Sequence, residues 1–150
     1  MKMSPQYIKA QANMKPGVIT SSGFLGDDER PILDIISHDE ETMRKLNLDF
    51  AEVAEAMHRI MTEGLKGLGE PITVDEVLLV QVNDARGFLP CPFEDGIFRK
   101  TNVAARLAST GRLLLYSDLS LHLFEKHHFL QGRGSPFRLE PEVLKEVLRL

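Results

Sequence analysis

The chain has 150 residues, of which 43% are hydrophobic and 27% charged, and its formal net charge is −4. This length suits one domain with its own core, and the composition excludes disordered and collagen-like proteins. The first residues, MKMSPQYIKA, lack the apolar core of a signal peptide, and no apolar run is long enough to span a membrane. A single cysteine excludes an internal disulfide. We therefore expect a soluble cytoplasmic protein without a membrane partner.

Charge is distributed unevenly along the chain. Residues 1–85 carry 8 basic and 15 acidic side chains, whereas residues 86–138 carry 8 basic and 4 acidic ones. The positive potential of the second segment would favour an anionic ligand or an acidic partner surface, unless the two segments simply attract each other within one fold. The helices of the first segment are acidic, so we do not expect them to bind DNA, whose phosphates select lysine and arginine.

The N-terminal part is predicted to be irregular first and helical afterwards. Residues 1–26 are rich in loop-forming residues and form an N-terminal arm, in which Ser4-Pro5 can begin a short helix. A single domain then covers residues 27–150. One helix begins near Pro31, and Asp49 caps a second helix over residues 50–66, whose apolar residues recur every three or four positions.

The central part predicts an antiparallel sheet. Strands are expected at residues 77–82, 98–106 and 112–116, and the short turns between them indicate meander order. The first and third of these strands are so apolar that they should lie inside the sheet. Helices over residues 118–128 and from Pro141 onward complete an α+β fold with N-terminal helices, a three-stranded antiparallel meander sheet and C-terminal helices. The residues expected to be buried are Met57, Leu79, Val103 and Leu115.

One loop and one helix together suggest a metal site. The segment 86–96 is the longest expected connection, and two prolines flank its only cysteine, Cys91. A hairpin follows, and then a helix that carries His122 and His127, with His128 next to it. This order of a cysteine turn, a hairpin and a helix with two histidines resembles a two-cysteine, two-histidine zinc finger. The second cysteine is absent, and Glu94 stands near its place, next to Asp95.

The resemblance implies a set of candidate metal ligands: Cys91, Glu94, His122 and His127. Zinc accepts thiolate, carboxylate and imidazole ligands in tetrahedral geometry, and the spacing of the two histidines suits it. The alternative is that the cysteine is a small buried thiol and that the histidines bond only to protein groups. We expect no cofactor from the sequence as a whole, and zinc is the ion that these four residues could hold.

A second candidate site lies in the loop Gln131-Gly-Arg-Gly-Ser135. Glycines on both sides of Arg133 would let its guanidinium approach an anion, with Ser135 donating a hydrogen bond and Arg138 and Lys126 adding charge. The alternative is that this loop is an ordinary connection between helices.

Three functional hypotheses follow from these observations. The first is a non-enzymatic binding or regulatory module that presents a histidine- and arginine-lined surface of its C-terminal half to an anionic ligand or a protein partner. The second is a small enzyme that uses Cys91 or His122 in a pocket between the Pro-Cys-Pro loop and the histidine-bearing helix, with Cys91 lining that pocket and exposed to substrate. The third is a metal-binding unit of zinc-finger type or a structural partner in an oligomer.

Overall fold

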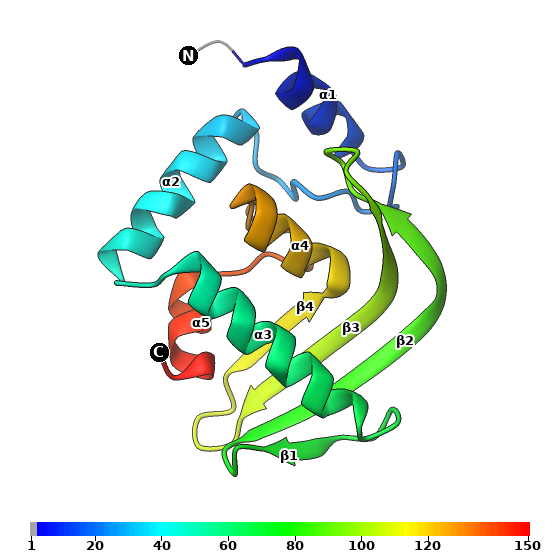
Figure 1. The fold of residues 1–150 in the computed structure, drawn as a ribbon. Helices are drawn as coiled ribbons and strands as arrows, with labels where there is room; N and C mark the ends of the chain where they lie inside the picture. Colours follow the sequence, from blue (N-terminus) through cyan, green and yellow to red (C-terminus); the bar gives the residue numbers. More distant parts are fainter. Residues whose placement is uncertain (1–2) are drawn as a thin grey trace.

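A computed structural model describes residues 3–150 as three helices, a four-stranded antiparallel sheet and two further helices (Figure 1). The α+β architecture expected from the sequence is confirmed, and the chain forms a single domain. The elements are α1 (Pro5–Asn13), α2 (Ile32–Lys45), α3 (Phe50–Leu65), β1 (Ile72–Val74), β2 (Leu78–Pro90), β3 (Ile97–Leu107), β4 (Leu113–Ser117), α4 (Asp118–His127) and α5 (Pro141–Leu148).

The helices begin where the sequence places capping groups. The Asp49 side chain accepts a hydrogen bond from the backbone N–H of Glu52 at the start of α3. Ser117 and Ser120 form a reciprocal capping box at the start of α4, so two amides that lack partners within the helix are satisfied. Helices α1 and α5 begin with a proline, whose missing N–H costs nothing at that position.

The sheet has the strand order β1-β2-β3-β4, so the meander order is confirmed but the strand number is four rather than three. Strand β1 has only three residues, too few to show an alternating pattern. The expected end of the first strand at residue 82 is wrong, because β2 continues pairing with β3 as far as Pro90. A bulge between Ala85 and Phe88 absorbs the turn-forming residues, and Gly87 adopts a φ of 99° there.

All helices lie on one face of the curved sheet, and this decides which strand residues are buried (Figure 1). Met57 and Val103 are fully buried as expected, at 0% and 1% exposure. The expectation for Leu79 and Leu115 is wrong, because they point to the uncovered face and are 43% and 42% exposed. The strand at residues 113–117 is likewise an edge strand instead of an interior one. The strand is apolar throughout because Leu114 and Tyr116 are buried under the helices, while Leu113 and Leu115 lie exposed on the opposite face.

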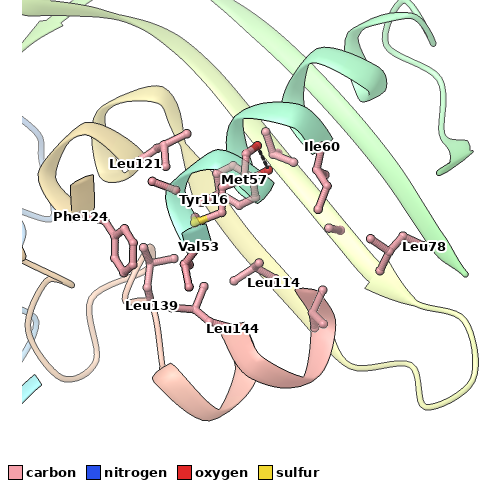
Figure 2. Close-up of a cluster of buried hydrophobic side chains, with 14 of the residues drawn as sticks. Val53, Met57, Ile60, Leu78, Leu114, Tyr116, Leu121, Phe124, Leu139 and Leu144 are labelled. Atoms are coloured by element: carbon pink, nitrogen blue, oxygen red, sulfur yellow. Dashed lines mark hydrogen bonds between the residues drawn. The ribbon is translucent and has the colours of Figure 1, made fainter. Parts of the chain in front are cut away.

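Two groups of buried side chains form the core. The larger group, called the sheet cluster here, joins the inner face of the sheet to α3, α4, α5 and the end of α2. Within it, the Tyr116 hydroxyl donates a 2.7 Å hydrogen bond to the Met57 carbonyl (Figure 2). The smaller group, called the tip cluster, joins α1, α2 and α4 to the turn between β2 and β3. Its buried members are Ala10, Met14, Phe24, Ile32, Ile35, Ile36, Cys91, Leu119, Leu123 and Phe129.

The segment predicted as an irregular arm contains α1 and takes part in the tip cluster. Ala10, Met14 and Phe24 are nearly fully buried there. A polar contact also joins α1 to the β2–β3 turn, because the Asn13 side chain donates a 2.9 Å hydrogen bond to the Pro92 carbonyl. Helix α1 therefore packs on the β2–β3 turn. In the part of the chain that the structure describes, no helix combines the length and the hydrophobicity needed to cross a bilayer.

Candidate metal centre

The turn between β2 and β3 holds a cysteine and an aspartate on the same side. The backbone N–H of Cys91 donates to the Gly96 carbonyl at 2.9 Å, and the N–H of Glu94 donates to the Cys91 carbonyl at 2.8 Å. Glu94 adopts a left-handed φ of 62°, which allows the chain to reverse so tightly. The closed turn brings the side chains of Cys91 and Asp95 together.

Helix α4 supplies two imidazoles to the same place. His122 and His127 lie five positions apart, and both direct Nε2 toward the Asp95 carboxylate. The helix lies with Leu121 and Phe124 in the sheet cluster and with other leucines in the tip cluster, so its rotation about its own axis is fixed by packing on both sides. The histidine side chains are 13% and 21% exposed at the edge of this packing.

The four side chains Cys91, Asp95, His122 and His127 form a compact set of donor atoms. Nε2 of His122 lies 3.0 and 3.1 Å from the two Asp95 oxygens, and Nε2 of His127 lies 2.7 Å from Oδ2. One donor atom from each residue can be chosen so that all four lie within 4.8 Å of one another. Ligands of a tetrahedral ion with bonds of about 2.1 Å lie roughly 3.4 Å apart. Small rotations of side chains would therefore bring this set to zinc geometry.

Aromatic rings hold both imidazoles in place. Phe98 stacks on His122 with ring centroids 4.2 Å apart, and Phe93 stacks on His127 at 4.0 Å. Tyr7 of α1 meets Phe93 edge-on at 5.9 Å, which extends the support to the N-terminal helix. Such packing restricts the imidazole rotamers before any ligand binds, and it shields the donor atoms from water.

The protonation states of the group reflect its burial. Burial, together with the neighbouring Asp95 carboxylate, raises the pKa of the Cys91 thiol to about 12. Burial opposes ionisation of Asp95 too, but hydrogen bonds from Cys91, His122 and His127 outweigh it and hold the Asp95 pKa well below its usual range. Desolvation lowers the pKa of His127 against the opposing effect of Asp95. The free group is thus a neutral thiol and a carboxylate that accepts hydrogen bonds from its neighbours.

Three of the four predicted ligands meet, and the fourth does not. Glu94 points away from the cluster, where its carboxylate contacts Nζ of Lys9 at 3.2 Å and the Asn13 amide at 3.4 Å. The adjacent Asp95 takes its place, because the turn that Cys91 and Gly96 close puts position 95 beside the thiol. Sequence alone could have favoured Asp95 through the Asp-Gly pair that ends the turn, but the choice depends on turn geometry that spacing does not reveal.

The third histidine of the helix end is used elsewhere. His128 follows α4 with a left-handed φ of 52°, which turns its ring away from His127. Its Nδ1 lies 2.7 Å from a Glu40 oxygen, and its ring stacks on Phe50 with centroids 3.8 Å apart. Of the two neighbouring histidines, only His127 is therefore placed to be a ligand.

The residues predicted to bind an anion do not form one common site. Two of them contact other protein groups, and the other two lie elsewhere on the surface. Arg138 forms an ion pair with the buried Asp39 and a 3.0 Å contact with Glu140, and the Ser135 hydroxyl donates to the Gln131 side chain at 2.6 Å. Arg133 lies in a shallow depression with Asp27, Asp28, Glu29 and Arg30, whose carboxylates do not favour a further anion. Lys126 is exposed on α4. Anion binding at these residues remains a prediction.

Of the arrangements found in residues 3–150, the Cys91–Asp95–His122–His127 group is the one whose donors suit a metal ion. Thiolate, carboxylate and two imidazoles are ligands that zinc accepts together, whereas calcium and magnesium prefer oxygen ligands throughout. Comparisons of the chain with protein-family models, with curated proteins and with solved structures found no match.

Proposed function

We propose that this protein binds one zinc ion through Cys91, Asp95, His122 and His127, and that the ion has a structural role. The observation that carries the proposal is the convergence of four donor atoms within 4.8 Å at the junction of the β2–β3 turn and α4. Four protein ligands fill a tetrahedral site, and closed sites of this kind are typical of structural rather than catalytic zinc.

The position of the four ligands indicates that a bound ion would connect the β2–β3 turn to α4. Two ligands come from the turn and two from α4, while α1 packs on the turn through Asn13 and Tyr7. A bound ion would link segments some 30 residues apart in the sequence and would hold the surface on which α1 docks. In small domains the free energy of zinc binding contributes directly to folding.

The burial of the cysteine favours a metal ligand over a nucleophile. Cys91 is 1% exposed, so a substrate in solution cannot reach its sulfur. A nucleophilic cysteine needs a thiolate that a substrate can reach. The groove beside His127, lined also by Tyr7, Lys9 and Phe93, does not include Cys91. We therefore propose a non-enzymatic, zinc-stabilised binding module.

The direct test is the metal content of protein from which any affinity tag has been removed, produced in zinc-supplemented medium. We expect close to one equivalent of zinc in the wild type and in His128→Ala, whose histidine faces Glu40, and less than a tenth of an equivalent in His127→Ala. Less than a tenth of an equivalent in the wild type would end the proposal.

Cobalt substitution tests the identity of the ligands. Cobalt(II) bound to a thiolate in a tetrahedral site has an intense charge-transfer band in the near ultraviolet and strong visible bands. We expect both in the cobalt-loaded wild type and only weakened visible bands in Cys91→Ser. An unchanged near-ultraviolet band in Cys91→Ser would show that the thiolate is not a ligand.

A further inference from the structure

A cavity of about 440 Å³ lies apart from the metal cluster, and none of the four proposed zinc ligands lines it. Strand β4 ends at Ser117, so the segment of β3 that precedes Asn102 has no partner on that side of the sheet. The cavity lies against this part of β3, and the loops of residues 19–24 and 131–137 close it. Its volume falls in the range of small-molecule sites, roughly 300–1,000 Å³.

The charged groups of the cavity are all basic. Arg99 and Lys100 line it, and no aspartate or glutamate does. Among residues 3–150, neither of these two side chains forms an ion pair or a side-chain hydrogen bond, although acidic residues outnumber basic ones in the protein by 22 to 18. Elsewhere, arginines such as Arg138 are paired with carboxylates. The cavity is thus lined by an exposed arginine and a half-buried lysine, and no carboxylate pairs with either side chain within the described residues.

A buried amide adds hydrogen-bond donors to the same cavity. Gln131 is 3% exposed, and its Oε1 accepts the 2.6 Å hydrogen bond from Ser135. Its Nε2 donates to no atom of residues 3–150 within hydrogen-bond distance, yet it is not sealed off from the cavity. The amide is therefore a donor at the cavity wall, and a ligand oxygen could accept from it in place of water. The backbone of Gln131 has a φ of 70°, which is uncommon for residues other than glycine.

The walls around these donors are closely packed and partly apolar. Gly132 lies so close to the other loop that a Cβ at this position would lie 2.1 Å from the Leu25 carbonyl oxygen, and the N–H of Gly132 donates to the Phe24 carbonyl at 2.9 Å. Leu89, Leu119 and Phe137 supply apolar surface. A preformed site of this kind spends less free energy on ordering when a ligand binds.

We propose that this cavity binds a small amphipathic organic anion, with an anionic head contacting Arg99, Lys100 and the Gln131 amide, and an apolar body lying on the leucines and Phe137. Two cations, an unused buried amide and an apolar wall complement a carboxylate or phosphate attached to a hydrocarbon. This site is separate from the proposed zinc site, and either proposal can fail without the other.

The test uses the full chain as purified and three probes that share an eight-carbon body: octanoate, octyl phosphate and octanol. Binding is followed by heteronuclear NMR titration. We expect saturable shifts centred on residues 20–24, 99–102 and 131–137 with at least one of the anions, and at least tenfold weaker binding of octanol. Equal affinity for octanol and both anions, or shifts elsewhere, would overturn the proposal.

Three variants test whether the affinity depends on the two cations. Arg99→Ala/Lys100→Ala removes both cations and should weaken binding of the preferred anion at least tenfold, whereas Arg106→Ala, on the same strand but outside the cavity, should leave it unchanged. Lys100→Met, which keeps the length of the side chain, should give a smaller loss in the same direction. Wild-type affinity in the double variant with unchanged thermal unfolding, or an equal loss in Arg106→Ala, would refute the proposed role of these cations.

Discussion

The two hydrophobic clusters of this protein differ in how much of their stability can come from packing alone. The sheet cluster has 21 buried residues drawn from four strands, four helices and the loops beside them, whereas the tip cluster has 10 and includes the turn that carries Cys91. Apolar burial is the main favourable contribution to folding, so the larger cluster can support itself. The smaller one lies where α1, α2 and the β2–β3 turn meet, and a metal link there would have the greatest effect.

The largest expected effect is loss of zinc. A site saturated at 1,000 times its dissociation constant stabilises a folded protein by about 4 kcal/mol, equivalent to roughly 8–16 °C for a chain of this size. We expect chelation to lower the melting temperature of the wild type by this order and to leave His127→Ala unaffected. Hydrogen exchange should accelerate in residues 91–96 and in α1 before it does in α3. Equal acceleration in both clusters would remove the proposed difference between them.

The complementary prediction concerns the sheet cluster. Met57 is fully buried and its backbone carbonyl accepts the Tyr116 hydroxyl, so Met57→Ala leaves a cavity and should destabilise the protein by about 2–5 kcal/mol in urea unfolding. Zinc stoichiometry should stay at one, because the packing of the tip cluster does not depend on this side chain. A change below about 0.5 kcal/mol would mean that the site collapses freely or that the cluster is less tightly packed than described.

Local sequence signals predicted most elements but not their burial. Caps and apolar periodicity located α3, α4 and α5, because these signals depend only on residues near one another in the chain. Leu79 and Leu115 were misjudged, since no property of a strand says whether helices cover its second face. The same limit applies to the site: Cys91, His122 and His127 followed from residue type and order, but Asp95 rather than Glu94 depends on a hydrogen bond between Cys91 and Gly96. The cavity at Arg99 is lined by five separate segments of the chain, and no spacing rule predicts it.

A smaller effect should come from Asp28, which connects the loop before α2 to the loop after α4. Its side chain is 2% exposed, bonds to Arg30 at 2.6 and 2.9 Å, and accepts the backbone N–H of Arg133 at 3.3 Å. The Arg30 hydrogen bond holds the pKa of Asp28 well below its usual range, against the opposing effect of burial. Asp28→Asn should therefore cost about 1–3 kcal/mol at neutral pH.

The pH dependence of that loss has a definite sign. Because the folded pKa is the lower one, the unfolded chain takes up the proton first as pH falls, so the contribution is full above the unfolded pKa of about 4 and decreases below it. The difference in unfolding free energy between wild type and Asp28→Asn should be constant from pH 7 to 5 and shrink from pH 4 downward. Asp75→Asn is the matched control, since the Asp75–Arg59 pair is half exposed and should contribute little. A difference that grows on acidification would contradict the assignment.

The smallest expected effect comes from His128, and it separates the metal from ordinary histidine–carboxylate pairs. His128 and Glu40 join α4 to α2, yet both side chains are 40% exposed, and only one carboxylate oxygen lies near the ring. Such a pair contributes roughly 0–1 kcal/mol, and stacking on Phe50 adds a similar amount. We expect His128→Ala to lower stability by about 1 kcal/mol in urea unfolding, and to leave the drop in melting temperature on chelation equal to that of the wild type. His127→Ala, one residue away, should abolish that drop. If the two variants instead lose the same stability and respond alike to chelation, the stability of the tip cluster would come from its histidine–carboxylate contacts and not from a metal held by Asp95 and its three neighbours.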